Sequence, residues 1–306
     1  MSAKVVITHI PEYSFPSLAQ RTAVLLEKAG LTPSPGHHIL VKPNLVSPSN
    51  ASHCCTHPMI VKAACAYLLD HKVKITVADS PAFGNASHAA RRSGLRQAMA
   101  ELGLEVTSLR HPTPLPLSQG GTIGISKDAL EKDLILNIPK LKVHCQMTIS
   151  GAVKNLFGCV VGFRKAVAHN RLGHSHEVFR SMLMDVYDAL PTTFHLMDGI
   201  HSMHKDGPIN GEPFELGLLS ASNNGIALDT AAYVILGLQP NQVPLWEEAY
   251  MRRLVGSHPD DIVYPFENTG VFDTTGFEMS NKRPLDFHLL RLIKGRVRSL
   301  MKRFVK

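Results

Sequence analysis

Basic side chains that could bind an anion or move a proton gather in residues 133–170. They are Lys140, Lys142, His144, Lys154, Arg164, Lys165 and His169. No acid stands between Asp133 and Glu177, so these groups have no acidic partner close in the sequence. Glycine lets a backbone approach a ligand closely, and the stretch contains Gly151, Gly158 and Gly162. We therefore predict a site for an anionic ligand; the alternative is a solvated surface loop.

Two of these residues are candidates for catalysis. His144 carries an imidazole with an ordinary pKa of about 6.5, which suits proton transfer or metal binding. Lys154 lies in the apolar segment AVKNLFG, where desolvation lowers an amine pKa, and such an amine forms imines or holds an anion. The structural alternatives are a hydrogen bond from His144 to the loop backbone and a Lys154 side chain that extends to solvent.

Polar residues also follow each of several predicted strands, at 38–42, 74–78, 134–137 and 193–197. In a parallel sheet those strand ends lie along one edge, so we expect the polar groups to meet in a single cleft. With Asn155 from the glycine-containing stretch, the predicted ligand-binding residues are Lys42, Asn44, Asp79, Ser80, Lys140, Lys142, Asn155 and Asp198.

The elements that would position these residues alternate between strands and helices. Helices are predicted at 16–29, 56–71, 91–102 and 178–189, and Thr56 is the expected N-cap of the second. This alternation predicts an α/β fold with a mostly parallel, doubly wound sheet and helices on both faces. The ligand cleft would lie at the carboxyl edge of the strands. The proline-rich residues 111–121 are a candidate boundary between lobes.

Histidines with neighbouring carboxylates suggest a divalent metal as a candidate cofactor. The proposed ligands are His169 and His201, and Asp198 and Asp206 lie near the second in the sequence. None of the five cysteines forms a CxxC motif, so a [4Fe–4S] cluster is not expected on this chain. The cofactor is otherwise unknown.

The composition is that of a globular protein, with 44% hydrophobic and 19% charged residues in 306. No apolar run is long enough to span a membrane and no signal peptide is evident, which indicates a cytoplasmic location. The net charge of +7 comes from residues 282–306, which hold nine basic residues and one acid. The preceding 281 residues are nearly neutral, so nucleic acid is not an expected partner.

The C-terminal residues 282–306 form a separate predicted unit after a module at 1–281. Apolar residues recur there at helical spacing, with basic residues on the remaining faces. This pattern is typical of a helix that lies on an anionic membrane surface or in the groove of a protein partner. The alternative is a terminal helix that packs its apolar stripe on its own domain.

Six segments in chain order resemble the family called domain of unknown function 362. They read VKPNLV, THPMIV, ADSP, NIPKLKVH, MTISGAVKNLFG and DGI…GP…G. The resemblance covers about residues 42–238, and KxH…GxxKNxFG is its most distinctive part. Many relatives of that family carry a ferredoxin-like iron–sulfur segment after this module. Here no cysteine follows Cys159, so the resemblance does not extend to cluster binding.

A remoter likeness is to lactate racemase, which uses a nickel-pincer nucleotide tethered to a lysine. The corresponding order here is His144, Lys154, Gly158 and His169-Asn170. The resemblance implies the cofactor-tethering position for Lys154, a metal-ligating position for His169 and an acid–base position for His144.

The likeness to the racemase is incomplete at two strand ends. Asp79-Ser80-Pro81 replaces the second catalytic histidine, and Lys42-Pro43-Asn44 lacks the substrate-binding arginine. Two-base racemisation is therefore not implied. We favour an enzyme that binds an anionic small molecule or cofactor; the alternative is a non-catalytic accessory protein that docks to an iron–sulfur or electron-transfer partner.

Overall fold

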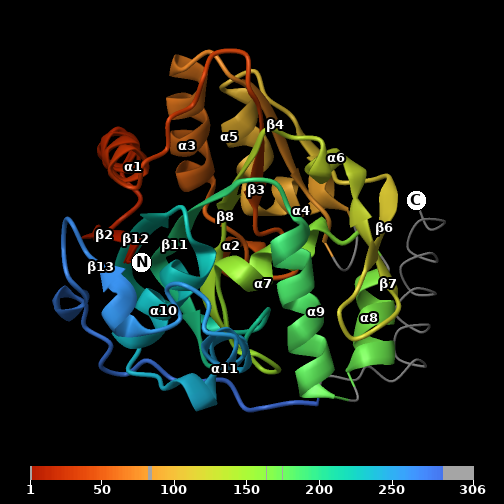
Figure 1. The fold of residues 1–306 in the computed structure, drawn as a ribbon. Coiled ribbons are helices and arrows are strands. Elements are labelled where there is room, and N and C mark those ends of the chain that lie inside the picture. The colour runs from red at the N-terminus through yellow and green to blue at the C-terminus, as the bar shows by residue number, and fades with distance from the viewer. Residues whose placement is uncertain (1, 82–84, 163, 174, 285–306) are drawn as a thin grey trace.

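The computed structural model of the chain describes residues 2–81, 85–162, 164–173 and 175–284 (Figure 1). A nine-stranded sheet forms its centre. From one edge, the strand order is β5 (Val106–Ser108), β4 (Lys74–Asp79), β3 (His38–Pro43), β8 (Leu134–Ile138), β11 (Thr193–His204), β12 (Glu212–Ser222) and β2 (Val6–His9). The remaining two strands are β9 (Lys140–His144) and β10 (Thr148–Ser150).

Most neighbouring strands in the sheet are parallel. The pairs β5–β4, β4–β3, β3–β8, β8–β11 and β9–β11 are parallel, whereas β9–β10, β11–β12 and β12–β2 are antiparallel. β8 and β9 both pair with β11 and are separated by Pro139, which has no N–H to donate to a ladder. The predicted α/β class with a large, mostly parallel sheet is confirmed.

Helices cover both faces of the sheet because the strands are apolar on both sides. Ile39 and Val41 face a core shared with α1 (Ser17–Lys28), α3 (Pro58–Asp70), α4 (Ala86–Ser93) and α5 (Leu95–Ala100). Leu40 faces the opposite core, to which α7 (Ala152–Leu156), α8 (Arg164–Leu172), α9 (His176–Ala189) and α11 (Pro244–Met251) contribute. A third cluster packs α10 (Gly225–Ile235) against Leu141 and Val143 of β9. In Figure 1, α1, α3 and α5 lie in the upper half and α10 and α11 in the lower half.

Short elements complete the described chain. They are β1 (Ala3–Lys4) paired with β13 (Ile262–Val263), α2 (Ala51–Cys54), α6 (Lys127–Leu130), and four 3-10 turns at Phe157–Cys159, Pro240–Gln242, Pro259–Asp261 and Thr269–Val271. The proline-rich connection expected at 111–121 contains the strand β6 (Pro112–Pro116) and the turn of an antiparallel hairpin, whose second strand is β7 (Thr122–Ser126).

Two local predictions were wrong. Residues 140–144, expected to lie beyond the strand predicted at 134–137, form the strand β9, because Leu141 and Val143 pack in the core while Lys140 and Lys142 find polar partners. Residues 198–201, expected just beyond a strand, lie inside β11, which continues to His204 along β12 with a bulge between Gly199 and His201. The second correction changes where Asp198 and His201 lie.

The N-cap of α3 also differs from the prediction. His57 takes this position, and its side chain accepts a hydrogen bond from Met59 N. The Thr56 hydroxyl instead donates to Ile138 O at 2.6 Å and accepts from Asn44 N at 2.8 Å. Thr56 therefore ties the end of β3 to the end of β8.

The described chain contains no helix long and apolar enough to cross a membrane. The amphipathic helix predicted at 282–306 falls almost wholly on residues 285–306, which lie outside the described residues.

Candidate functional site

A cavity of about 610 Å³ lies beside the carboxyl ends of β3, β4 and β9 and beside α7 and α8. Its size is within the usual range for small-molecule sites. The predicted site residues that line it are Asn44, Asp79, Ser80, Lys142, His144, Lys154, Asn155 and His169. Lys42 lies behind this wall, fully buried. Lys140, Asp198 and His201 do not line this cavity.

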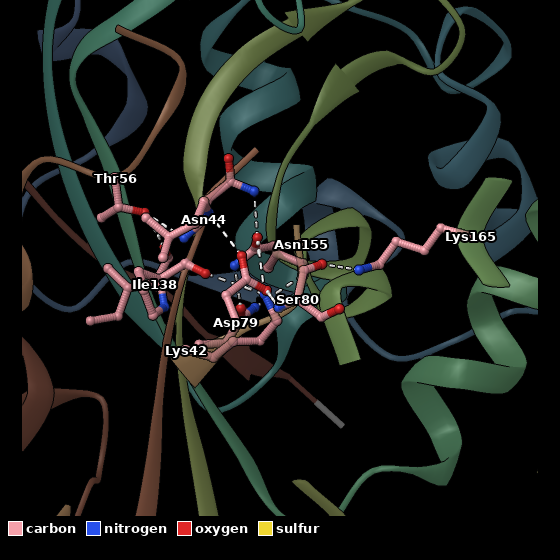
Figure 2. A network of polar contacts seen from close by, with 12 residues as sticks. Lys42, Asn44, Thr56, Asp79, Ser80, Ile138, Asn155 and Lys165 are labelled. Atoms are coloured by element: carbon pink, nitrogen blue, oxygen red, sulfur yellow. Dashed lines mark hydrogen bonds and ion pairs between the residues drawn. The ribbon is translucent and has the colours of Figure 1, made fainter. Parts of the chain in front are cut away.

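A buried ion pair between β3 and β4 forms the back of the cleft (Figure 2). Lys42 Nζ lies 2.8 Å from Asp79 Oδ1, and Lys42 is wholly inaccessible. The Asp79 carboxylate also accepts hydrogen bonds from Leu45 N and Ser80 N, each at 2.8 Å. Because both charges are desolvated, they depend on one another and on these backbone donors. The pair fixes the positions of the two loops that leave β3 and β4.

Asn155 links this pair to the rest of the wall. Its Oδ1 accepts from Asn44 Nδ2 at 2.5 Å and from Lys42 Nζ at 3.4 Å. Its Nδ2 donates to Asn137 Oδ1 at 2.7 Å, and Asn137 in turn donates to His195 Nδ1 at 3.0 Å. Asn155 is 3% exposed and lines the cavity, and this chain of hydrogen bonds fixes its position; its ligand-binding role stays a prediction.

Two glycines of the distinctive segment are required by close contacts. A Cβ atom on Gly158 would overlap Lys42 Nζ and Asp79 Oδ1. A Cβ atom on Gly151 would overlap the carboxylate of Asp229, which accepts hydrogen bonds from Ala152 N and Val153 N at the start of α7. The two glycines therefore let this segment approach α10 at one end, through Asp229, and the ends of β3 and β4 at the other, through Lys42 and Asp79.

Two lysines in the cleft are held by oxygen acceptors. Lys142 Nζ donates to Asn44 Oδ1 and, at 2.7 Å, to Cys54 O. Lys165 Nζ donates to Ser80 O, as Figure 2 shows. Burial lowers the pKa of each amine to about 8. Both remain sources of positive charge in the cleft near neutral pH.

Lys154 differs from these lysines because it has no oxygen acceptor and no acidic partner within the described residues. Its amine lies 4.7 Å from the centre of the Phe157 ring, and its side chain is half-buried and lines the cavity. Burial, followed by the charges of Lys165, Lys142 and Lys42, lowers the pKa of this amine to about 7.

His144 lines the same cavity with a defined tautomer. Its Nδ1 accepts a hydrogen bond from Gln146 N at 3.1 Å, so the neutral ring carries its proton on Nε2. Burial and then the Lys154 and Lys142 cations hold the pKa of His144 well below its ordinary value. The ring is therefore neutral near pH 7 and can act as a hydrogen-bond donor through Nε2.

His169 also lines the cavity, where its ring packs 4.5 Å from the ring of Phe179, measured between centres. The second proposed metal ligand, His201, lines a different cavity, so the structure does not bring these two histidines together. Within the described part of the chain, no three His, Cys, Asp or Glu side chains are grouped as a metal site would require. We therefore derive no chemistry through a metal.

Lys140 and Asp198 form a separate polar cluster. Lys140 Nζ lies 3.0 Å from Asp198 Oδ2 and 2.9 Å from the hydroxyl of Tyr13, which donates to Asp198 Oδ1 at 2.7 Å. Burial alone would raise the pKa of Asp198, but the Lys140 cation and the hydrogen bonds from Tyr13 and His57 N lower it. This cluster borders the cavity that contains His201, so the predicted strand-end groups do not all meet in one cleft.

Several residues of the site did not appear among the predicted ones. Lys165 belongs to the basic stretch but was not distinguished there from its neighbours. Asn137 ends a buried strand, the same signal that selected Asn44 and Asp79. Tyr13 offered no signal, because its partner Asp198 is 185 residues away in the sequence.

Comparisons with known proteins agree with the sequence resemblance. The thylakoid-associated protein sll1697 of Synechocystis is 32% identical over 314 residues, covering 100% of this chain and 97% of that protein. The lactate racemase apoprotein of Thermoanaerobacterium thermosaccharolyticum has a TM-score of 0.50 at 10% identity, over 75% of this chain and 56% of the racemase. A Thermotoga maritima protein has a TM-score of 0.43 at 11% identity, over 76% of this chain and 61% of its own.

The racemase likeness concerns the fold alone at this level of identity, and this chain spans little more than half the length of the racemase. The family comparison reaches further. The family described as Domain of unknown function (DUF362) matches residues 39–234, a segment that contains every residue described above around the main cleft. Together with the full-length similarity to the Synechocystis protein, this match shows that the chain belongs to the DUF362 family.

Proposed function

We propose that the chain is an enzyme whose main cleft binds an anionic small molecule or cofactor. The observation that carries this proposal is the amine of Lys154, which lines the cleft without an acceptor in the described structure. Lys142 and Lys165 add positive charge to the same cavity. A cation that is desolvated and has no counter-ion is costly in the free protein, and an anionic ligand would offset that cost.

The rest of the cleft suits a ligand with both polar and apolar parts. His144 supplies an Nε2–H donor. Asp206 and Arg283 also line the cavity, and a nitrogen of the Arg283 guanidinium lies 2.9 Å from Asp206 Oδ1. Apolar side chains, among them Leu45, Phe157 and Ile209, line the remainder. The alternative of an accessory protein for an iron–sulfur partner stays a prediction, because no feature of the described structure favours it.

Anion binding is tested first on the purified protein. Mass spectrometry of the intact chain and elemental analysis would reveal a ligand or metal that is retained through purification. Titration calorimetry with inorganic phosphate and with oxalate would then measure affinity. Replacing Lys154 with Met removes a charged contact worth about 1.5–3 kcal/mol, so we expect roughly a tenfold or greater loss of affinity for the anion that binds. Unchanged affinity in Lys154→Met would contradict the proposal.

A second proposal concerns association with a membrane surface. Two observations favour it: the Synechocystis relative is described as thylakoid-associated, and residues 282–306 combine an apolar stripe with nine basic residues. Basic residues near an anionic membrane surface each contribute about 1 kcal/mol of attraction. We infer that the C-terminal segment binds such a surface while the α/β module carries the cleft.

Deleting residues 285–306 should abolish sedimentation with phosphatidylglycerol vesicles and leave the melting temperature of the module unchanged. Binding by the full chain should weaken as salt is raised, and vesicles of phosphatidylcholine should not bind it. A matched variant with the basic residues of the segment changed to Gln keeps the apolar stripe and should also lose binding. If the truncated chain melts many degrees lower, the segment packs on the module and the proposal fails.

A further inference from the structure

Three lysines of the described residues line the main cleft, and they differ in what their amines can do. Lys142 donates to Asn44 Oδ1 and Cys54 O, and Lys165 donates to Ser80 O. Their lone pairs become available only if these hydrogen bonds are lost. Lys154 has no such acceptor among the residues that the structure describes, so its amine can react without disrupting the wall of the cleft.

The surroundings of Lys154 favour the neutral amine, which is the nucleophilic form. The half-buried side chain lies over the Phe157 ring, and Lys165, Lys142 and Lys42 repel a further charge. With its pKa lowered to about 7, Lys154 has near neutral pH an unprotonated fraction roughly a thousand times that of an exposed lysine. A free, partly neutral amine in a ligand cavity is suited to addition to a carbonyl group.

His144 supplies the second group that such a reaction needs. Both side chains line the same cavity, and the Lys154 cation is one of the charges that lower the pKa of His144. The hydrogen bond from Gln146 N to Nδ1 leaves the proton on Nε2. This N–H can donate to a carbonyl oxygen.

We propose that the ligand of the cleft is an aldehyde or ketone with an anionic group, bound as an imine on Lys154. This inference rests on the proposed anion-binding function and names its ligand class. Lys142 and Lys165 retain their acceptors and still present charge to the cavity, so they would hold the anionic group while Lys154 reacts with the carbonyl.

The covalent step balances without an oxidant or reductant. The amine lone pair of Lys154 forms a C–N bond to the carbonyl carbon, and the developing oxyanion accepts a hydrogen bond from the neutral His144 ring through Nε2–H. One proton then moves from the positively charged adduct nitrogen to that oxygen, which becomes a hydroxyl group, and His144 keeps its own proton. A second proton from the nitrogen leaves with the hydroxide as water when the C–O bond breaks. The products are one imine and one water molecule.

The test uses pyridoxal 5′-phosphate, which has an aldehyde and a phosphate, followed by reduction with sodium borohydride and peptide mapping. We expect one adduct per chain, with roughly tenfold or more label on Lys154 than on any other lysine, consistent with its larger neutral fraction. Lys154→Met and Lys154→Arg should both lose this adduct. The arginine variant keeps the positive charge but cannot form the imine, so it separates charge from covalent chemistry.

A matched ligand distinguishes this inference from the proposed function. Pyridoxine 5′-phosphate has the same phosphate and ring, but an alcohol replaces the aldehyde. If it binds the wild-type chain in titration calorimetry while the aldehyde leaves Lys154 unlabelled, imine formation is refuted and anion binding stands. If neither compound binds and the label is spread over exposed lysines, the cleft does not bind anions of this size. That result refutes both the ligand class and the proposed function for such anions.

Discussion

Replacing Asp79 with Ala is expected to destabilise the protein by about 3–5 kcal/mol, because the change leaves the Lys42 cation buried without its partner. Lys42 is wholly inaccessible and lies 2.8 Å from the Asp79 carboxylate. The backbone N–H groups of Leu45 and Ser80 would lose their acceptor as well. Urea denaturation monitored by circular dichroism measures the free energy of unfolding.

The control for this prediction is an ion pair of similar chemistry on the surface. Glu131 lies 3.3 Å from Lys127, and both side chains are about 60% exposed. Glu131→Ala should cost less than about 1 kcal/mol, as exposed pairs do. The double variant Lys42→Met with Asp79→Leu removes both buried charges and should recover much of the lost stability. A cost for Asp79→Ala no greater than that of Glu131→Ala would show that the pair is not a structural anchor.

The sequence predicts the general position of the cleft because strand ends are a local signal. Asn44, Asp79 and Ser80 each follow a buried apolar run, and the parallel order of β3 and β4 brings them together. The unusual environment of Lys154 could also be predicted from local sequence, because a lysine within an apolar segment must either reach solvent or be desolvated. These inferences need only the strand order and the hydrophobic pattern.

The partners of each charge could not be predicted, because they depend on contacts between distant segments. Lys142 is held by Cys54 O, which is 88 residues away, and Lys140 by Tyr13, which is 127 residues away. Alternation along β9 correctly suggests that Lys140 and Lys142 project from the same side, since Leu141 and Val143 pack in the core. It does not show that the two lysines border different cavities.

The length of β11 could not be predicted from the local sequence pattern either. Asp198-Gly199 reads as a turn, but β12 pairs with β11 through His204 and keeps the strand extended past a bulge. Asp198 then receives hydrogen bonds from Tyr13 and His57 N instead of facing the main cleft. Long-range strand pairing thus overrides the turn preference of the dipeptide.

Replacing Lys154 with Met is expected to stabilise the protein at acidic pH, although it should impair ligand binding. The amine titrates near 10.5 in the unfolded chain and at about 7 in the folded one. Between these values the unfolded chain binds more protons, so the stability contributed by Lys154 is present above pH 10.5 and is lost as the pH falls through 7. At pH 6 the loss is on the order of a few kcal/mol. The methionine side chain carries no charge and avoids it.

The measurement is urea denaturation of the wild-type chain and Lys154→Met at pH 6 and pH 10. The variant should be the more stable protein at pH 6, and the difference should shrink toward zero at pH 10, where the lysine is neutral in the folded state. Burial raises the pKa of Asp229 to about 7, so its contribution to folding stability is lost as the pH rises through 7. Asp229 is present in both proteins, so this contribution cancels in the difference between them. Lys74→Met, at an exposed position that begins β4, is the matched control and should show no such gain. If Lys154→Met is less stable than wild type at pH 6, the amine of Lys154 has a stabilising partner. That result would contradict the unpaired cation on which the binding proposal depends.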